Sequence, residues 1–215
     1  MTKINKEALL DCLEGYKRLG YNYIDPIVIP SVKYITQLHE LPQEIDLLKK
    51  HIDNCNLCPL SNNKDNFEKK LYDHNSIMSL FLSPNILEDQ AKAELFKKIV
   101  QNVLKIDIKD ISISYAIQCH TSTRISIQEC SNSCKTYLFK EIALLKPKVI
   151  LMFGDVYNIF FDTNEDIVKI SGSIIKYQNS IVVPLVGLEF IQKNPSYKKR
   201  LFIDLLKVKN ILENL

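Results

Sequence analysis

The chain lacks any long hydrophobic run. None of its 215 residues belongs to a stretch approaching the ~18 to 20 apolar residues that a membrane-spanning helix needs. The first 21 residues, MTKINKEALLDCLEGYKRLGY, also lack the apolar segment of a signal peptide. We therefore expect a cytoplasmic protein that makes no contact with a membrane.

The chain also lacks a strong excess of charge of either sign, and it has no internal repeat. A net charge of +3 permits contact with nucleic acid but falls short of the basic balance that would argue for it. Apolar residues make up 46% of the chain and charged residues 25%, as in ordinary globular proteins and unlike disordered ones. We expect one substantial core, a monomer, and a short N-terminal extension.

Apolar strand-like segments alternate with segments of helical periodicity. Strands are predicted at 76–82, 111–119 and 146–154, with two or three more within 167–186. Helices are predicted at about 6–19, 41–52 and 88–104, after a capping box that begins at Ser126, and after Asn194 as a cap. This alternation predicts an α/β fold, a three-layer α/β/α sandwich around a mostly parallel central sheet.

Six cysteines are the most specific feature of the sequence. In a reducing cytosol, spaced cysteines indicate metal ligands or small buried residues rather than disulfides. A Cys-x-x-Cys pair sets two thiolates on one turn, and two further cysteines complete either a zinc site or a four-iron cluster. The cysteines are the pair Cys55 and Cys58, then Cys119, then Cys130 and Cys134 one helical turn apart, with Cys12 alone in the first predicted helix. Their spacing leaves zinc, an iron-sulfur cluster and buried bystanders all open.

Four segments together resemble the iron-sulfur class of uracil-DNA glycosylases, the family-four type: CNLCPLS, AIQC, CKTYLFKEIALLKPKVILMFG and VVPLVGLEFIQKNPSYKKRLFIDLLKV. The resemblance covers most of residues 52–212, which implies a glycosylase-like domain at 46–215 and an accessory segment at 1–45. It implies a 4Fe-4S cluster and a role in DNA repair. The implied ligands are Cys55, Cys58, Cys119 and Cys134, with Cys130 as the alternative fourth ligand.

The residues that do the family's chemistry are absent from the matching positions. The Gly-Glu-x-Pro-Gly motif falls on FLSPN, with Phe81 and Leu82 at the places of the glycine and the acid. Tyr115 replaces the asparagine that reads the base, and its ring cannot offer the paired donor and acceptor of an amide. The His-Pro-Ser motif falls on residues 187–189, Gly-Leu-Glu, where an acid would repel phosphate. The resemblance thus implies a fold that has lost uracil excision and acts by binding DNA or a protein.

Other residues could have taken over the catalysis of a different reaction. Tyr115, His74 or His120 could serve a glycosylase for another damaged base, although a loop histidine is usually only solvated. Glu88 and Asp89 stand at the start of a predicted helix, where carboxylates more often complement the helix dipole than act as catalysts.

Basic residues near the expected cleft have two readings. Arg124 and Lys135, and the run Lys198, Lys199 and Arg200, could contact phosphates or could simply be solvated surface charge. A third reading of the whole chain is an interaction module in which zinc is held by Cys55, Cys58, Cys130 and Cys134.

Overall fold

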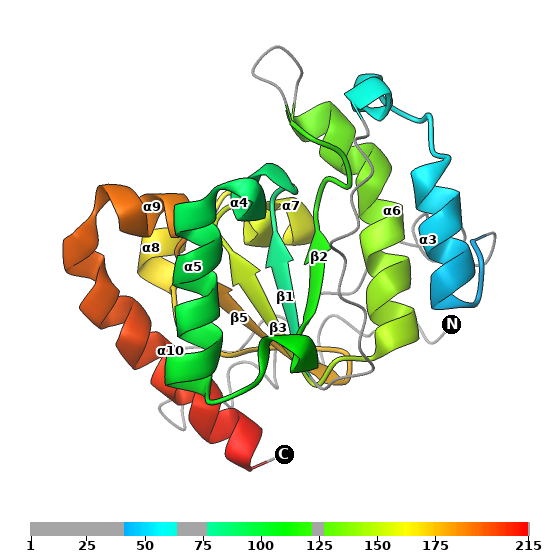
Figure 1. The fold of residues 1–215 in the computed structure, drawn as a ribbon. Helices are drawn as coiled ribbons and strands as arrows, with labels where there is room; N and C mark the ends of the chain where they lie inside the picture. Colours follow the sequence, from blue (N-terminus) through cyan, green and yellow to red (C-terminus); the bar gives the residue numbers. More distant parts are fainter. Residues whose placement is uncertain (1–40, 64–76, 122–126, 215) are drawn as a thin grey trace, which may run out of the picture.

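A five-stranded sheet forms the centre of the molecule (Figure 1). The structure is a computed structural model, and it describes residues 41–63, 77–121 and 127–214. The strands are β1 (Ile77–Phe81), β2 (Ser112–Tyr115), β3 (Val149–Phe153), β4 (Ile175–Tyr177) and β5 (Ser180–Leu185). Their order is β2-β1-β3-β5-β4, and only β4 runs antiparallel to its neighbour.

Helices cover both faces of this sheet (Figure 1). The longer ones are α3 (Ile45–Asp53), α5 (Gln90–Lys98), η2 (Ile99–Leu104), α6 (Ile127–Leu145) and α10 (Lys198–Glu213). The shorter ones are α4 (Asn85–Glu88), α7 (Val156–Phe161), α8 (Ile167–Ile170) and α9 (Leu188–Lys193), with 3-10 turns η1 (Pro59–Asn63), η3 (Ile108–Asp110) and η4 (Pro195–Tyr197). Side chains of α5, η2, α9 and α10 pack on one face, whereas α6 and α7 pack on the other. The expected three-layer α/β/α sandwich is confirmed.

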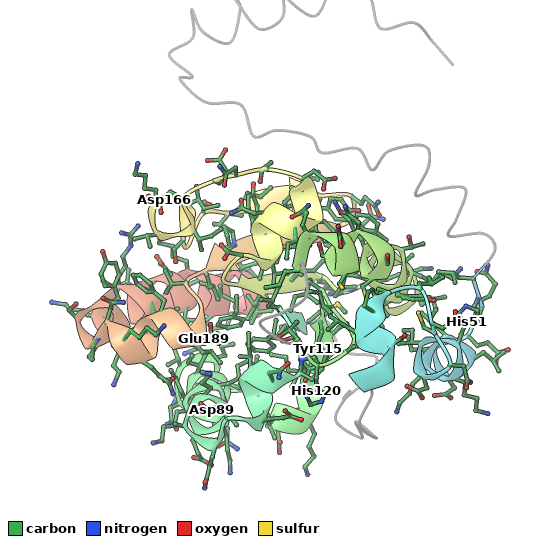
Figure 2. The ribbon with its side chains drawn as sticks, turned by 90° about the horizontal axis from the view of Figure 1, so that it is seen from above. His51, Asp89, Tyr115, His120, Asp166 and Glu189 are labelled. Atoms are coloured by element: carbon green, nitrogen blue, oxygen red, sulfur yellow. The ribbon has the colours of Figure 1, made fainter. Side chains whose placement is uncertain are left out.

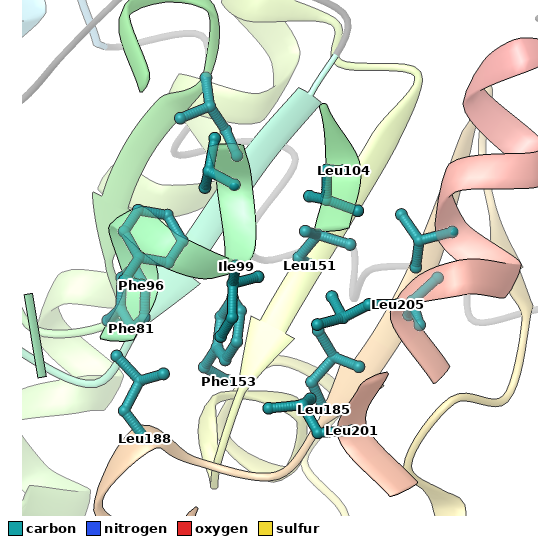
Figure 3. Packing of buried hydrophobic residues seen from close by; sticks show 14 of the residues in the cluster. Phe81, Phe96, Ile99, Leu104, Leu151, Phe153, Leu185, Leu188, Leu201 and Leu205 are labelled. Carbon is teal, nitrogen blue, oxygen red and sulfur yellow. The ribbon is translucent and has the colours of Figure 1, made fainter. Parts of the chain in front are cut away.

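The central strands are buried along their whole length, which explains their unbroken apolar sequences. Every residue of β1 and β3 is buried, because parallel strands with helices on both sides turn neither face to water. The side chains of alternate residues therefore pack into two separate cores, one on each face of the sheet. Figure 3 shows the core beneath α5 and α10, where Phe81 stacks on Phe153 at 4.9 Å between ring centroids and meets Phe96 edge-on at 5.0 Å.

Several sequence expectations differ from the observed elements. Residues 167–170 form the short helix α8 instead of a strand, because the Asp166 carboxylate accepts a hydrogen bond from the Val168 N–H (3.0 Å) and starts a helical turn. Two strands, β4 and β5, follow it. Asn194 does not cap the next helix through its side chain, since its amide donates to the Phe190 carbonyl at the end of α9. The helices α7 and α9 were not expected. The expected helix at 6–19 and Ser126 lie outside the described residues.

Among the described residues, no helix is both long enough and apolar enough to cross a bilayer.

Candidate metal centre and adjoining cleft

Five cysteines lie in the described part of the chain, on three separate segments. Cys55 and Cys58 lie between α3 and η1, where the chain leaves a helix that packs against α6. Cys119 follows β2, and the last two cysteines stand one turn apart in α6. The sixth, Cys12, is outside the described residues.

Three of the four cysteines that the resemblance implies as ligands pack at one buried cluster, and Cys55 lies at the edge of a second cluster. Cys134 is buried, and the charges of Cys119, Cys58 and Cys55 all act on its thiol. Burial is the main cause that raises the pKa of Cys134 to about 12, and the three neighbouring thiols raise it further. The Gln118 backbone N–H donates a hydrogen bond to the Cys134 sulfur and acts in the opposite direction. Residues about 80 positions apart in sequence thus share one electrostatic environment.

Cys130 lies beside this group but in a different position. It is fully buried, and burial together with a hydrogen bond to the Cys58 side chain raises its pKa to about 11. The Leu60 backbone N–H donates to its sulfur. Cys58 acts on the Cys130 thiol, whereas Cys119, Cys58 and Cys55 act on the Cys134 thiol. Both cysteines belong to the same buried cluster, so the structure leaves Cys134 and Cys130 as alternative fourth members of the set.

The immediate surroundings of the thiols are apolar. Leu60, Ile117 and three of the cysteines form one buried cluster, and Cys58 and Leu82 pack against it. Cys55 sits at the edge of a second cluster, where it hydrogen-bonds to the Tyr137 side chain. Burial is again the main cause that raises the pKa of the Tyr137 hydroxyl, with the Cys55 contact next. A dry shell with hydrogen bonds to sulfur is the environment that tunes protein-bound iron-sulfur clusters.

The donor set was tested against the two metal groups that the sequence leaves open. Across residues 41–63, 77–121 and 127–214, no three His, Cys, Asp or Glu side chains are placed to hold a single metal ion. A tetrahedral zinc site draws its sulfurs to ~2.3 Å from one centre, whereas a four-iron cluster is wider and its ligands stand further apart. Thiolates are ligands of both zinc and four-iron clusters, so the donor set leaves both groups open.

A pocket of about 380 Å³ opens beside β1, β3 and β5. Phe81, Phe153 and Val186 mark the carboxyl ends of these three strands in its lining. The chain turns from β2 on one side of β1 to β3 on the other, so this edge is the topological switch point of the sheet. Ligands of open α/β sheets bind in the crevice at such a point. The pocket therefore lies where ligands of such sheets usually bind.

The positions where the resemblance loses its chemistry are observed at this cleft. Phe81 is fully buried and Leu82 lines the pocket. Gly187 packs against Gly154: a Cβ added at Gly187 would stand 3.4 Å from the Gly154 Cα. Glu189 is exposed, and its carboxylate pairs with the Lys92 ammonium at 3.4 Å. No side chain among these offers the amide or the imidazole of the glycosylase motifs.

Tyr115 lies next to a small polar group rather than in the pocket lining. It is fully buried, and burial followed by the charge of Glu88 raises the pKa of its hydroxyl. The Glu88 carboxylate also lies 3.2 Å from His120 Nε2. Figure 2 shows Tyr115 and His120 close together when the sheet is viewed from above. The sequence named these three residues separately, and the structure brings them together.

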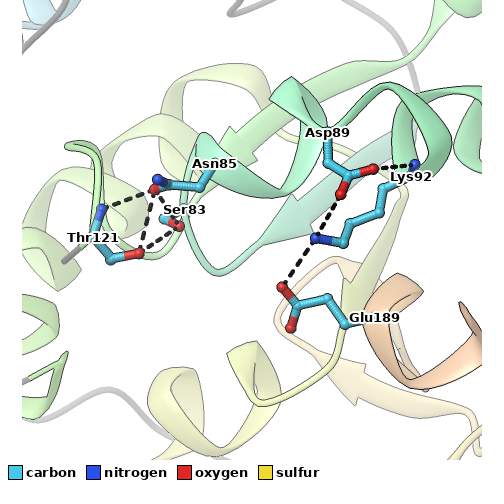
Figure 4. Close-up of polar contacts among 6 residues, drawn as sticks. All are labelled: Ser83, Asn85, Asp89, Lys92, Thr121 and Glu189. Carbon is cyan, nitrogen blue, oxygen red and sulfur yellow. Dashed lines mark hydrogen bonds and ion pairs between the residues drawn. The ribbon is translucent and has the colours of Figure 1, made fainter. Parts of the chain in front are cut away.

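A hydrogen-bond network joins Ser83, Asn85 and Thr121 (Figure 4). The Asn85 Oδ1 accepts from the Thr121 backbone N–H at 2.8 Å and from the Ser83 hydroxyl at 3.1 Å. It thereby ties the segment after β1 to the segment that carries Cys119. Nearby, Asp89 caps α5 by accepting from the Lys92 N–H at 3.1 Å, which confirms that this carboxylate serves the helix start.

The basic residues named from the sequence are separated in the structure. Lys198, Lys199 and Arg200 are exposed at the start of α10. Lys135 is only 1% exposed, and its ammonium pairs with Asp162 at 2.6 Å. The expectation that Lys135 contacts phosphate is wrong, because the side chain points into the protein. Arg124 and His74 lie outside the described residues.

Sequence reasoning missed the acidic rim of the pocket, formed by Asp155, Glu165, Asp166 and Glu189. Asp155 follows β3 and Gly154 in the sequence. Its place directly after a predicted strand was the sequence feature that could have indicated this rim.

No family model matches the chain, and no curated protein matches it.

Proposed function

We propose that this chain is an iron-sulfur protein with a uracil-DNA glycosylase-like fold, in which the cleft no longer excises uracil. The supporting observation is that Cys55, Cys58 and Cys119 all act on Cys134, as the ligands of one cluster would. Cys55, Cys58, Cys119 and Cys134 would hold a 4Fe-4S cluster, which would clamp α3, the β2 exit and α6 together. We place the protein in the cytoplasm, where thiols stay reduced.

Loss of excision is the second part of the proposal. Breaking the glycosidic bond requires groups that read the extruded base and stabilise the developing charge. The pocket instead presents apolar side chains, two glycines and four carboxylates. We propose that the protein acts in DNA repair by binding, with DNA or a protein as its partner, and as a monomer.

Purified full-length protein would be assayed for uracil release from single-stranded and double-stranded oligonucleotides. We expect no release above a blank. Robust uracil release would overturn the proposal for the cleft while leaving the metal proposal untouched.

A second candidate is a glycosylase acting on another damaged base, and the contact between Glu88 and His120 favours it. A panel of damaged-base oligonucleotides would be tested with the wild type, His120→Ala and Tyr115→Phe. Release that both variants abolish would establish this candidate, and inactivity on every substrate would exclude it for that panel.

Contact with DNA is tested through the exposed basic start of α10. Binding of a fluorescent oligonucleotide would be measured against salt for the wild type and for a Lys198→Ala, Lys199→Ala, Arg200→Ala variant. If these side chains neutralise phosphates, the slope of the logarithm of the binding constant against the logarithm of the salt concentration becomes less steep by about 2 to 3 in the variant. An unchanged slope would leave a protein as the partner.

A further inference from the structure

The pocket at the strand ends has a floor of aromatic and aliphatic side chains. Phe81 and Phe153 stack beneath it with their ring planes 13° apart. Phe190, from α9, is partly exposed and reaches the same space. The cavity of about 380 Å³ falls within the ~300 to 1,000 Å³ typical of small-molecule sites. It therefore suits an apolar body of modest size.

The rim of this pocket is acidic. Asp155, Glu165, Asp166 and Glu189 are exposed, and they come from three separate segments of the chain. Figure 2 shows Asp166 and Glu189 on the same side of the molecule, away from His51 at the cysteine end. Among the described residues that line the pocket there is no lysine or arginine.

Part of this negative charge is balanced locally. Lys92 pairs with Glu189 at 3.4 Å, and Lys169 lies 3.7 Å from Asp166 in an exposed contact. Neither lysine lines the pocket, and no ion pair of Asp155 or Glu165 occurs among the described residues. The electrostatic potential at the mouth is thus negative, and a cleft with low-dielectric walls focuses such a potential.

We propose that this pocket binds an organic cation, namely an apolar or aromatic body that carries a protonated amine or a quaternary ammonium. The apolar body would enter the space above Phe81 and Phe153, and the cation would stay at the rim. Carboxylates attract it there, and the face of Phe190 adds a cation–π contribution. The rim equally disfavours a phosphate or a carboxylate. The inference concerns the cleft alone and does not depend on which metal the cysteines hold.

The test compares three probes on full-length protein: phenethylamine, its anionic counterpart 3-phenylpropionate, and neutral uracil. Binding would be followed by backbone-amide NMR shifts and by the melting temperature. We expect phenethylamine to shift the amide signals of Gly154, Gly187 and their neighbours and to raise the melting temperature. The two other probes should do neither.

Charge-neutral variants make the test specific to the rim. Asp155→Asn with Glu165→Gln should weaken phenethylamine binding by about tenfold or more. The matched control is Glu94→Gln with Asp110→Asn, which removes two exposed charges outside the pocket and should leave binding unchanged. Circular dichroism would verify that both variants fold. The proposal is overturned if phenethylamine fails to bind, if 3-phenylpropionate or uracil binds as tightly, or if the two double variants behave alike.

Discussion

The cysteine site and the pocket lie at the same edge of one sheet, yet their side chains differ in chemical type. Around the β2 exit and α6, cysteines from three segments lie near one another, three of them buried and two partly exposed. At the β1, β3 and β5 exits, apolar side chains and carboxylates stand where base-reading groups would be needed. The network around Asn85 lies between the two regions.

This contrast has a physical basis. Cysteine ligands far apart in sequence stabilise a fold directly when a metal group binds them, so their loss costs stability. Catalytic side chains, in contrast, contribute mainly to the reaction, and replacing them with apolar residues extends the core. Phe81, at the position that the resemblance matches to a motif glycine, fills the space between Phe96 and Phe153. Under the proposed function, the metal site would be kept for stability after excision is lost.

The largest expected effect separates Cys134 from Cys130. Cys134→Ser should remove most of the bound metal and lower the melting temperature strongly, because a ligand that clamps distant segments is lost. Cys130→Ser should retain the metal, since the resemblance implies Cys134 and not Cys130 as the fourth ligand. Metal analysis and calorimetry on both variants check this. Equal metal loss in both variants would favour the zinc set, which contains both cysteines. Metal loss only in Cys130→Ser would make Cys130 the fourth ligand in place of Cys134.

The next effect tests whether Phe81 belongs to the core. Phe81→Ala should destabilise the protein by about 3 to 5 kcal/mol, as expected for deletion of a fully buried aromatic side chain. Phe202, which is 47% exposed on α10, gives the matched control, and Phe202→Ala should change stability by at most about 0.5 kcal/mol. Urea unfolding measures both. A small loss for Phe81→Ala would mean that the ring serves the pocket and not the core.

A smaller effect concerns the boundary between the two regions. Asn85→Ala should cost about 1 to 2 kcal/mol, because it removes the acceptor of the Thr121 N–H and the Ser83 hydroxyl. Asn85→Asp keeps an acceptor oxygen and should cost less. Chemical denaturation at neutral pH distinguishes them. If both variants lose the same stability, the acceptor oxygen is not what ties the two segments.

The smallest effect concerns the Asp89 carboxylate near the rim. The backbone hydrogen bond from Lys92 is the main cause that holds the pKa of this group below its ordinary value of 3.8. A group whose pKa is lowered by folding stabilises the protein above its unfolded pKa, and that contribution is lost as the pH falls through the folded pKa. Asp89→Asn should therefore be less stable than the wild type at neutral pH, with the difference shrinking as the pH falls below the ordinary value of 3.8. Melting curves across this range measure it, and a pH-independent difference would argue against the capping role.

The sequence predicted the layers because buried parallel strands show as unbroken apolar runs. The cysteine set stays a prediction that rests on the resemblance, since a local pattern identifies only the Cys-x-x-Cys pair. The preference for Cys134 over Cys130 also rests on the resemblance, because both lie in α6 and both are buried. Residues 167–170 were misassigned because a short apolar run fits a strand and a helix equally well.

Features that depend on distant partners could not be predicted. The buried ammonium of Lys135 pairs with the carboxylate of Asp162. Asp162 follows α7, so β3 separates the two residues in the sequence. The acidic rim likewise joins three segments that only the folded sheet places together. Periodicity gives no information about such pairs.

The central claim is that four cysteines hold an iron-sulfur cluster in this fold. Its most direct test is the iron, sulfide and zinc content of full-length protein purified without oxygen, together with its visible absorbance. The account predicts a brown protein with about four iron and four sulfide per chain. A colourless protein that contains one zinc, or no metal at all, would contradict it.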